Sequence, residues 1–215
     1  MNPEQRKEAS ELQLHKRGIR INVQLHVIES DDEVTLRPRD ALAQRLIALW
    51  AVSGAALARD CTKFRAYIDA HQMHSFLSAQ EQAFLFSDSP TEEQFGQFLL
   101  RQESLYFLSW CAGLTEKIGV HAAPSNLKSV LKFFPHGMEA PDQLFTAINL
   151  RRKDLTMDWS DLLYRLHWEV RHCQITGRPC PASVNAQTIR EWHQAVNWMC
   201  QYEEEHNWDL VSTET

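Results

Sequence analysis

Glycine, proline and clusters of basic residues are scarce in this 215-residue chain, and each shortage excludes a class of protein. Seven glycines and eight prolines are too few for a loop-rich β-sandwich or a collagen-like chain. The 22 Lys and Arg residues form no basic arm and are outnumbered by 28 Asp and Glu, so the net charge is −6. Phosphate backbones repel such a chain, so we expect no nucleic-acid partner, whereas a basic protein would be attracted to it.

Disulfide and membrane signals are missing as well. The chain has five cysteines, an odd number, and no CxxC pair, which favours free thiols in a reducing cytoplasm. The N-terminal MNPEQRKEASEL is too polar for a secretory signal. The longest apolar run, residues 46–58, is too short to cross a bilayer. We therefore expect a soluble cytoplasmic protein with no membrane partner.

Catalytic, nucleotide-binding and metal-binding motifs are also lacking. The sequence contains no GxSxG, P-loop, GxGxxG, HExxH or HxH. A nucleophile elbow requires a strand before its serine, and Ser53 and Gly54 have none. Their small size predicts close packing of another helix instead. His71 and His74 are three residues apart without an acidic partner nearby, which is typical of surface histidines. No metal and no cofactor are predicted.

Amphipathic helical patterns, by contrast, fill most of the chain. Apolar residues recur at spacings of three and four, the period of a helix with one buried face. Capping residues mark helix starts; Ser78 and Glu81, for example, form a capping box. The principal helices are expected at residues 3–17, 38–57, 91–112, 158–175 and 185–203.

A strand-like pattern lies near the N-terminus. Ile21, Val23, Leu25 and Val27 alternate with polar residues, and the acidic turn SDDE separates them from a second short apolar stretch, VTL. This pattern predicts a small hairpin. We therefore expect a mainly α, single-domain, helical bundle-like fold over residues 1–215 with a small N-terminal β-hairpin, preceded by a helical appendage at residues 1–17.

The two C-terminal helices carry the strongest candidate site. Each has two apolar faces, so each is enclosed by neighbours, and the polar side chains between the faces must find hydrogen-bond partners. A histidine beside a carboxylate can act as a general base, and arginines can hold an anion. The same groups can equally form a structural network that orients two core helices, and this interpretation is favoured. The candidate polar pocket consists of Tyr164, Arg165, His167, Arg171, Glu191, His193 and Asn197.

The C-terminal tail, WDLVSTET, is polar except for Trp208 and Leu210. A polar terminus ordinarily frays, but a tryptophan favours docking on the body of the protein. Trp208 and Asp209 are therefore predicted to form a tail anchor. An exposed Trp208 would instead indicate a contact with a partner protein.

Three segments together carry a resemblance to a known family. They are LRPRDALAQRLIALWAVSGAAL (36–57), DLLYRLHWEVRHC (161–173) and IREWHQAVNWM with WDLVSTET (189–215). With FLLRQESLYFLSWCAGL, they resemble the bacterial family named domain of unknown function 4272, over about residues 17–215. The chain departs from the family pattern at Trp192, where an arginine is usual. The matching residues are Arg45, Glu103, Trp110, Tyr164, Arg165, His167, Trp168, Arg171, Glu191, His193, Asn197, Trp198, Trp208, Asp209 and Thr215.

Two functions stay open, because the family name implies no activity. The favoured hypothesis is a non-catalytic protein-binding or regulatory protein, such as a bacterial immunity or accessory protein, whose acidic surface holds a protein partner. The alternative is a small-ligand binder or hydrolase-like enzyme with its pocket between helices 158–175 and 185–203. The sequence does not define the oligomeric state.

Overall fold

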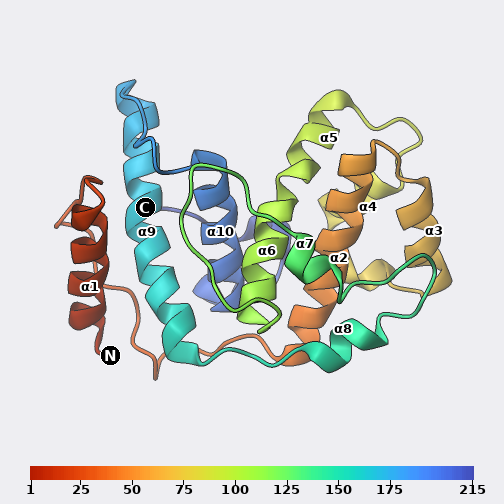
Figure 1. The fold of residues 1–215 in the computed structure, drawn as a ribbon, viewed down its shortest axis with the longest axis horizontal. Coiled ribbons are helices and arrows are strands. Elements are labelled where there is room, and N and C mark those ends of the chain that lie inside the picture. The colour runs from red at the N-terminus through yellow and green to blue at the C-terminus, as the bar shows by residue number, and fades with distance from the viewer.

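A computed structural model of the protein describes residues 1–215 as helices joined by turns and extended segments, without a β-strand (Figure 1). The mainly α fold is therefore confirmed. The α-helices are α1 (Pro3–Lys16), α2 (Arg39–Ala58), α3 (Thr62–Ala70), α4 (Ala79–Leu85), α5 (Glu92–Leu99), α6 (Arg101–Cys111), α7 (Lys128–Leu131), α8 (Asp142–Ala147), α9 (Lys153–Thr176) and α10 (Ala186–Met199). Short 3-10 turns lie at His74–Phe76, Tyr202–Glu204 and Trp208–Leu210.

Capping side chains set the starts of several helices. Asn2 caps α1 in a capping box with Gln5, and Ser78 caps α4 in the predicted box with Glu81. Asn185 accepts hydrogen bonds from two backbone amides of the first turn of α10. At its other end, α9 stops at Gly177, whose left-handed backbone (φ 67°) suits glycine. Local sequence chemistry therefore determines these four boundaries.

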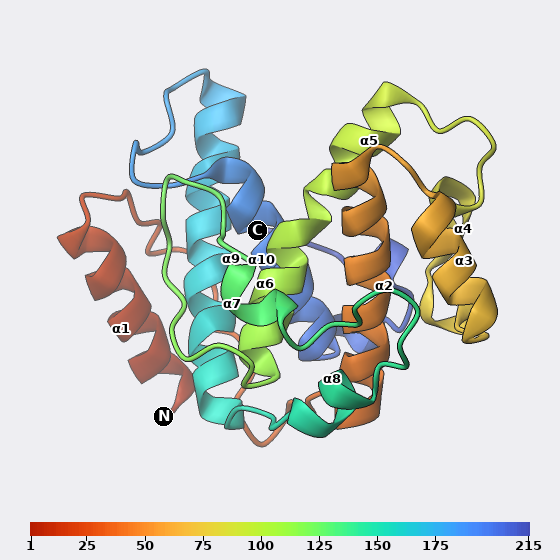
Figure 2. The ribbon, with the colours of Figure 1, turned by 45° about the vertical axis from the view of Figure 1, so that its right-hand side comes forward.

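The helices lie side by side in an order that differs from their order in the chain (Figures 1 and 2). α1 packs on α9, α9 on α10, α10 on α6, α6 on α2, and α2 on α3 and α5. The C-terminal pair α9 and α10 thus lies between α1 and α6. This arrangement encloses α10 on two sides, as its two apolar faces predicted.

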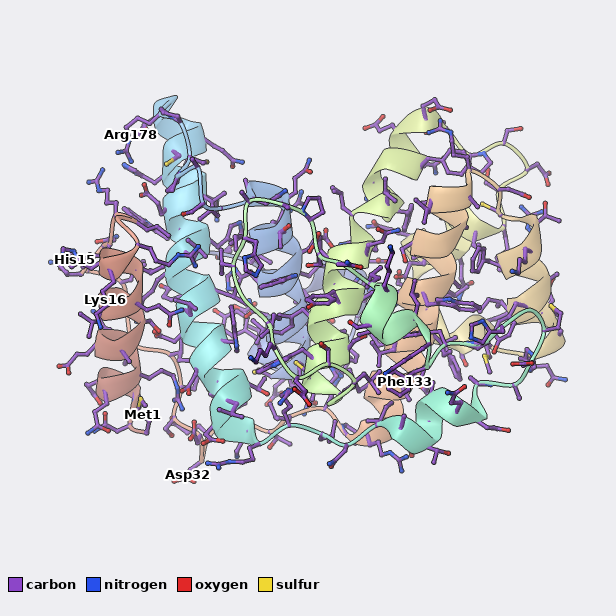
Figure 3. The ribbon with its side chains drawn as sticks, in the orientation of Figure 1. Met1, His15, Lys16, Asp32, Phe133 and Arg178 are labelled. Atoms are coloured by element: carbon purple, nitrogen blue, oxygen red, sulfur yellow. The ribbon has the colours of Figure 1, made fainter.

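An aromatic cluster fills the space where α6, α9 and α10 meet. Trp192 of α10 is 1% exposed and has its ring centroid 5.6 Å from that of Phe107 and 5.7 Å from that of Trp159. Figure 3 shows how side chains from these helices occupy the spaces between the ribbons. Position 192 is therefore a core position in this chain, and tryptophan fills it with apolar surface.

The predicted N-terminal β-hairpin is wrong. Residues 19–38 form an extended connection with turns, and their backbone carbonyls accept hydrogen bonds from side chains of other elements. Lys7 donates to the carbonyls of Val23 and Leu25, and Arg165 donates to that of His26. Because long basic side chains from α1 and α9 satisfy these groups, the two apolar stretches have no need to pair with each other.

The connection also ties α1 to α9 through a buried arginine. Arg6 is 1% exposed, and it donates to Asp31 in the connection at 2.8 Å and to Asp158 of α9 at 2.9 Å. Figure 3 places the neighbouring Asp32 in the connection beside the first turns of α9. Charge pairing therefore holds this segment where strand pairing was expected.

The helix expected at 91–112 is two helices, α5 and α6, which meet at Leu100. Gly96 does not break α5; an added Cβ there would meet nothing within 4 Å. α10 ends at Met199 rather than near residue 203, because Gln201 and Glu203 have left-handed backbones (φ 54° and 56°). A helix cannot continue through such residues.

α2 is long and apolar enough to cross a membrane, but 72% of its apolar stretch is buried inside the protein. Such burial is typical of a core helix and is consistent with a soluble protein. The small residue Gly54 lets the ring of Phe64 lie directly against the helix, since a Cβ at Gly54 would be 2.4 Å from Cζ of Phe64. The prediction of close packing at Ser53-Gly54 is confirmed.

We predict opposite effects for two glycine substitutions. Gly54→Ala should lower the free energy of unfolding by about 1–3 kcal/mol, because the new methyl group overlaps Phe64. Gly96→Ala should raise it by about 0.5–1 kcal/mol, since alanine favours the helix and meets no neighbour there. Urea unfolding measures both. Equal effects of the two variants would contradict the packing described for α2.

Candidate functional site

Two buried histidines face each other between α9 and α10. Nδ1 of His167 lies 2.8 Å from Nδ1 of His193, and the residues are 4% and 2% exposed. Their rings meet edge to face, with centroids 5.1 Å apart. The two central histidines singled out by the sequence are therefore partners of each other.

The neighbours of the pair determine its tautomers. Nδ2 of Asn197 lies 2.9 Å from the carbonyl oxygen of Ser212, which can only accept a hydrogen bond. The same Nδ2 lies 3.3 Å from Nε2 of His193, so this ring nitrogen accepts. The proton of neutral His193 is then on Nδ1, from which it is donated to Nδ1 of His167. A chain of hydrogen bonds thus runs from α9 through α10 to the tail.

The histidine pair is neutral at neutral pH. Burial, followed by the positive charges of Arg171 and Arg190, lowers the pKa of His167 to about 4. Burial, followed by His167 and Arg171, lowers the pKa of His193 to about 3. A second proton on His167 would place two donors against each other in the short Nδ1–Nδ1 contact, and a second proton on His193 would place a donor at Nε2 against the amide nitrogen of Asn197. The geometry and the direction of both pKa shifts therefore agree.

Glu191, although two residues from His193, faces a different helix. Its carboxylate accepts hydrogen bonds from Arg101 at 2.9 Å and from the hydroxyl of Ser104 at 2.6 Å, both on α6. Gln194 also accepts from Arg101 at 2.9 Å. The carboxylate therefore joins α10 to α6 and does not contact the histidine pair.

Arg165 lies on the opposite side of α9 from this ion pair. It binds both carboxylate oxygens of Asp161, at 2.8 and 2.9 Å, and lies 3.6 Å from Glu11 of α1. Tyr164 is half-buried, and burial raises its pKa. Arg171 is exposed. The structure thus separates the predicted pocket residues. The histidine pair lies with Asn197, and Tyr164 lies beside it, with its ring centroid 6.4 Å from that of His193. Glu191 lies at the contact of α10 with α6, Arg165 at the contact of α9 with α1, and Arg171 at the surface.

The tail tryptophan is inserted between two arginines. Trp208 is 2% exposed, and the guanidinium carbons of Arg45 and Arg101 lie 4.8 and 5.8 Å from its ring centroid. Its carbonyl accepts a hydrogen bond from Gln194, and Asp209 accepts one from the backbone of Gln80 at 3.0 Å. Cation–π contacts and hydrogen bonds thus hold the tail on the body of the protein.

The remaining matched residues serve neighbouring contacts. Arg45 forms a buried ion pair with Glu81 of α4. Glu103 accepts hydrogen bonds from the backbone and the hydroxyl of Ser125, at 2.9 and 2.6 Å, and so fixes the irregular segment after α6. These charges connect elements of the fold to one another.

An acidic cavity of about 430 Å³ lies at the C-terminal end of α10. Its walls come from the connection after α1, from α9 and α10, and from the loop at residues 201–206. Four glutamates line it, Glu29, Glu33, Glu203 and Glu204, together with His206 but no Lys or Arg. The side chains that line the cavity therefore carry an excess of negative charge.

Buried residues form the inner part of the cavity. Val34, Met157 and Cys200 supply an apolar surface, and Ser160 and Asn197 supply polar atoms. Cys200 donates its thiol to Met157, and burial, followed by the charge of Glu29, raises the pKa of this thiol to about 12. The thiol therefore stays neutral and is no nucleophile at neutral pH.

Sequence reasoning missed this cavity apart from Asn197. The run EEE at 203–205 and the acidic turn at 30–33 are separated by about 170 residues, so no local pattern connects them. The negative charge of each segment is the available signal, but the pattern around SDDE predicts a hairpin turn and that around residue 203 predicts a helix end. Left-handed backbones at Glu203 and Glu204 (φ 56° and 55°) now direct this loop over the cavity.

A second cavity of about 430 Å³ lies beside the tail, between α2 and the segment that precedes α4. Arg37 and Arg45 line it, but Arg37 already donates to the carbonyls of Trp198 and Glu205, and Arg45 is paired with Glu81. Its cations are therefore engaged within the protein. No group of three or more His, Cys, Asp or Glu side chains is arranged to hold a metal ion.

Fold and site together define an all-helical protein with a buried neutral histidine pair and an acidic cavity. The chain belongs to the family described as Domain of unknown function (DUF4272), which it matches over residues 6–211. The match begins inside α1. No curated protein and no solved structure matches the chain.

We predict that stability falls with acid because of the histidine pair. In the unfolded chain, His167 and His193 take up protons near pH 6.5. In the folded protein, the same two histidines do so only near pH 4 and below. The stability that the two neutral histidines contribute is therefore fully present above pH 6.5. It is lost as the pH falls from 6.5 to about 4 for His167 and to about 3 for His193, by up to about 1.4 kcal/mol per pH unit for each proton. Urea unfolding at several pH values measures this slope.

The matched variants for this test are His193→Gln and His136→Gln. The first removes one buried histidine and should reduce the slope by about one proton, provided that it folds at pH 7.5. The second removes an exposed histidine and should leave the slope nearly unchanged. Imidazole NMR of the unaltered protein gives an independent reading, and a His167 or His193 signal titrating near pH 6.5 would contradict the prediction.

We also predict that Trp208 holds the C-terminal tail. Trp208→Ala should lower the free energy of unfolding by about 3–5 kcal/mol and speed digestion by carboxypeptidase, because a buried aromatic ring is lost. Trp208→Phe should cost less, since the buried indole N–H has no partner. Leu210→Ala is the control, because Leu210 is 64% exposed. Unchanged digestion of Trp208→Ala would refute the anchor.

Proposed function

We propose that the protein is a non-catalytic binding or regulatory protein that holds a basic partner protein at the acidic cavity. The observation that carries this proposal is the convergence of four glutamates, from two distant segments, on a cavity whose wall has no Lys or Arg. Carboxylates on a wall without Lys or Arg attract a cation, and a bound basic group would supply the positive charge that the wall lacks. The net charge of −6 adds long-range attraction for a basic partner.

The positions of the potential catalytic groups support a non-catalytic role. His167 and His193 are buried against each other, and Glu191 is paired with Arg101. A general base must reach the proton that it removes, and neither histidine lines the acidic cavity. The alternative of a hydrolase-like enzyme with these residues has correspondingly less support.

Binding of a small ligand is the second candidate function. The cavity volume of about 430 Å³ lies within the range of small-molecule sites, and apolar and polar groups are mixed in its wall. We place the protein in the cytoplasm, which the five free cysteines support. A role as an immunity or accessory protein would fit an acidic surface that neutralises a basic protein.

We predict that the protein binds basic peptides at the cavity. Fluorescent peptides of equal length, one rich in Lys and Arg and one rich in Asp and Glu, should differ in anisotropy titrations. The basic peptide should bind, and its affinity should fall between 50 and 200 mM NaCl. The double variant Glu203→Gln/Glu204→Gln should weaken binding about tenfold, since each rim charge contributes roughly 0.7 kcal/mol.

The matched control is Glu116→Gln/Glu139→Gln, which removes two exposed carboxylates outside the cavity wall. It should bind the basic peptide nearly as well as the unaltered protein. If both double variants weaken binding equally, the attraction is a property of the whole surface and not of the cavity. If acidic and basic peptides bind alike, the proposed function is wrong.

A further inference from the structure

Two unpartnered oxygen atoms lie on the inner wall of the acidic cavity. Ser160 of α9 and Asn197 of α10 both line it and are 8% and 6% exposed. Neither the hydroxyl of Ser160 nor Oδ1 of Asn197 takes part in a hydrogen bond within the protein. Both oxygens open to the cavity and not to the sealed interior, so an N–H donor that enters the cavity can bind them in place of solvent.

The buried histidine pair determines where Oδ1 of Asn197 points. Nδ2 of the same amide donates to the carbonyl of Ser212 and to Nε2 of His193, so the amide cannot rotate without losing both bonds. The oxygen is thereby left as the free end of the side chain. A structural network inside the fold thus presents an acceptor to the cavity.

Negative charge accumulates at the entrance of the cavity. Burial raises the pKa of Tyr202, and the neighbouring charges of Glu203, Glu29 and Glu214 raise it further. Two cations contact the cavity wall from behind without lining the cavity: Lys153 donates to the carbonyl of Val34, and a guanidinium nitrogen of Arg37 lies 3.2 Å from Nδ1 of His206. The site therefore combines carboxylates at its rim with neutral acceptors inside.

We propose that this cavity is a subsite for a guanidinium group, which enters between the glutamates and donates to Ser160 and Asn197. The inference rests on the proposed function and specifies its chemistry: an arginine side chain of the partner is the expected occupant. A planar guanidinium offers five N–H donors in several directions, and acceptors lie on α9, α10 and both acidic segments.

An ammonium group fits the same cavity less well. It is more strongly hydrated, and the inner wall offers two neutral oxygens beside the apolar surface of Val34, Met157 and Cys200. A guanidinium loses less hydration on entering such a place, and its flat face can lie on an aromatic ring such as that of Tyr202. The wall therefore favours arginine over lysine.

The test uses ethylguanidinium and ethylammonium as probes of the full-length protein, followed by amide chemical shifts. Ethylguanidinium should shift the signals of Ser160, Asn197 and residues 201–204 and bind at least tenfold more tightly than ethylammonium. Ser160→Ala should weaken this binding about tenfold, because it removes one hydrogen bond to a charged group. Ser109→Ala is the matched control, since Ser109 is buried in α6, has an unpartnered hydroxyl and lies outside the cavity.

Peptides separate the two sources of a guanidinium. An arginine tripeptide that binds more tightly than its lysine counterpart, and loses affinity with Ser160→Ala, supports the subsite as a partner contact. Ethylguanidinium binding without peptide binding supports the subsite for a free small molecule and overturns the partner function. If binding of basic peptides requires Glu203 and Glu204 but is unaffected by Ser160→Ala, the guanidinium subsite is wrong, while the proposed function is retained. Equal binding of the two probes also overturns the subsite.

Discussion

The contact between α9 and α10 depends on one short hydrogen bond between two neutral imidazoles. It can form only while His167 and His193 share a single proton between their facing Nδ1 atoms, and burial keeps them in that state. This hydrogen bond permits only one alignment of the two helices, because shifting either helix by a turn would leave both rings buried without partners. Apolar packing brings the helices together, and the imidazoles fix how they align.

A chain of hydrogen bonds leads from this histidine pair to the C-terminal tail. His193 holds the amide of Asn197, and Asn197 holds the tail at Ser212. Trp208 then packs between Arg45 and Arg101, and Arg101 binds Glu191 two residues before His193. The tail, α10 and α6 are therefore mutually supporting, which explains why a polar terminus is ordered.

The buried arginines have carboxylate partners inside the protein, whereas the exposed glutamates at the cavity have no basic partner in its wall. Arg6, Arg101 and Arg165 are each paired with carboxylates inside the protein, as the cost of burying a charge requires. At the cavity the glutamates lack a basic counterpart in the wall. Charges in the core are paired, and the glutamates of the acidic cavity are not paired with Lys or Arg of its wall. This difference is the physical basis of the binding function proposed above.

The sequence by itself determined the positions of most long helices, the capping box of Ser78 and Glu81 and the family, because these follow from local spacing and from patterns within single segments. It also identified His167, His193 and Trp208 as buried groups that need partners. It could not determine which partners they find, so Glu191 and Arg165 were assigned to a pocket that they do not share. Tertiary structure alone decided that side chains replace a strand as partners of residues 19–38, and that two acidic segments about 170 residues apart meet beside Ser160. Such contacts depend on the order in which helices pack, and helical periodicity specifies a buried face but not the neighbour that covers it.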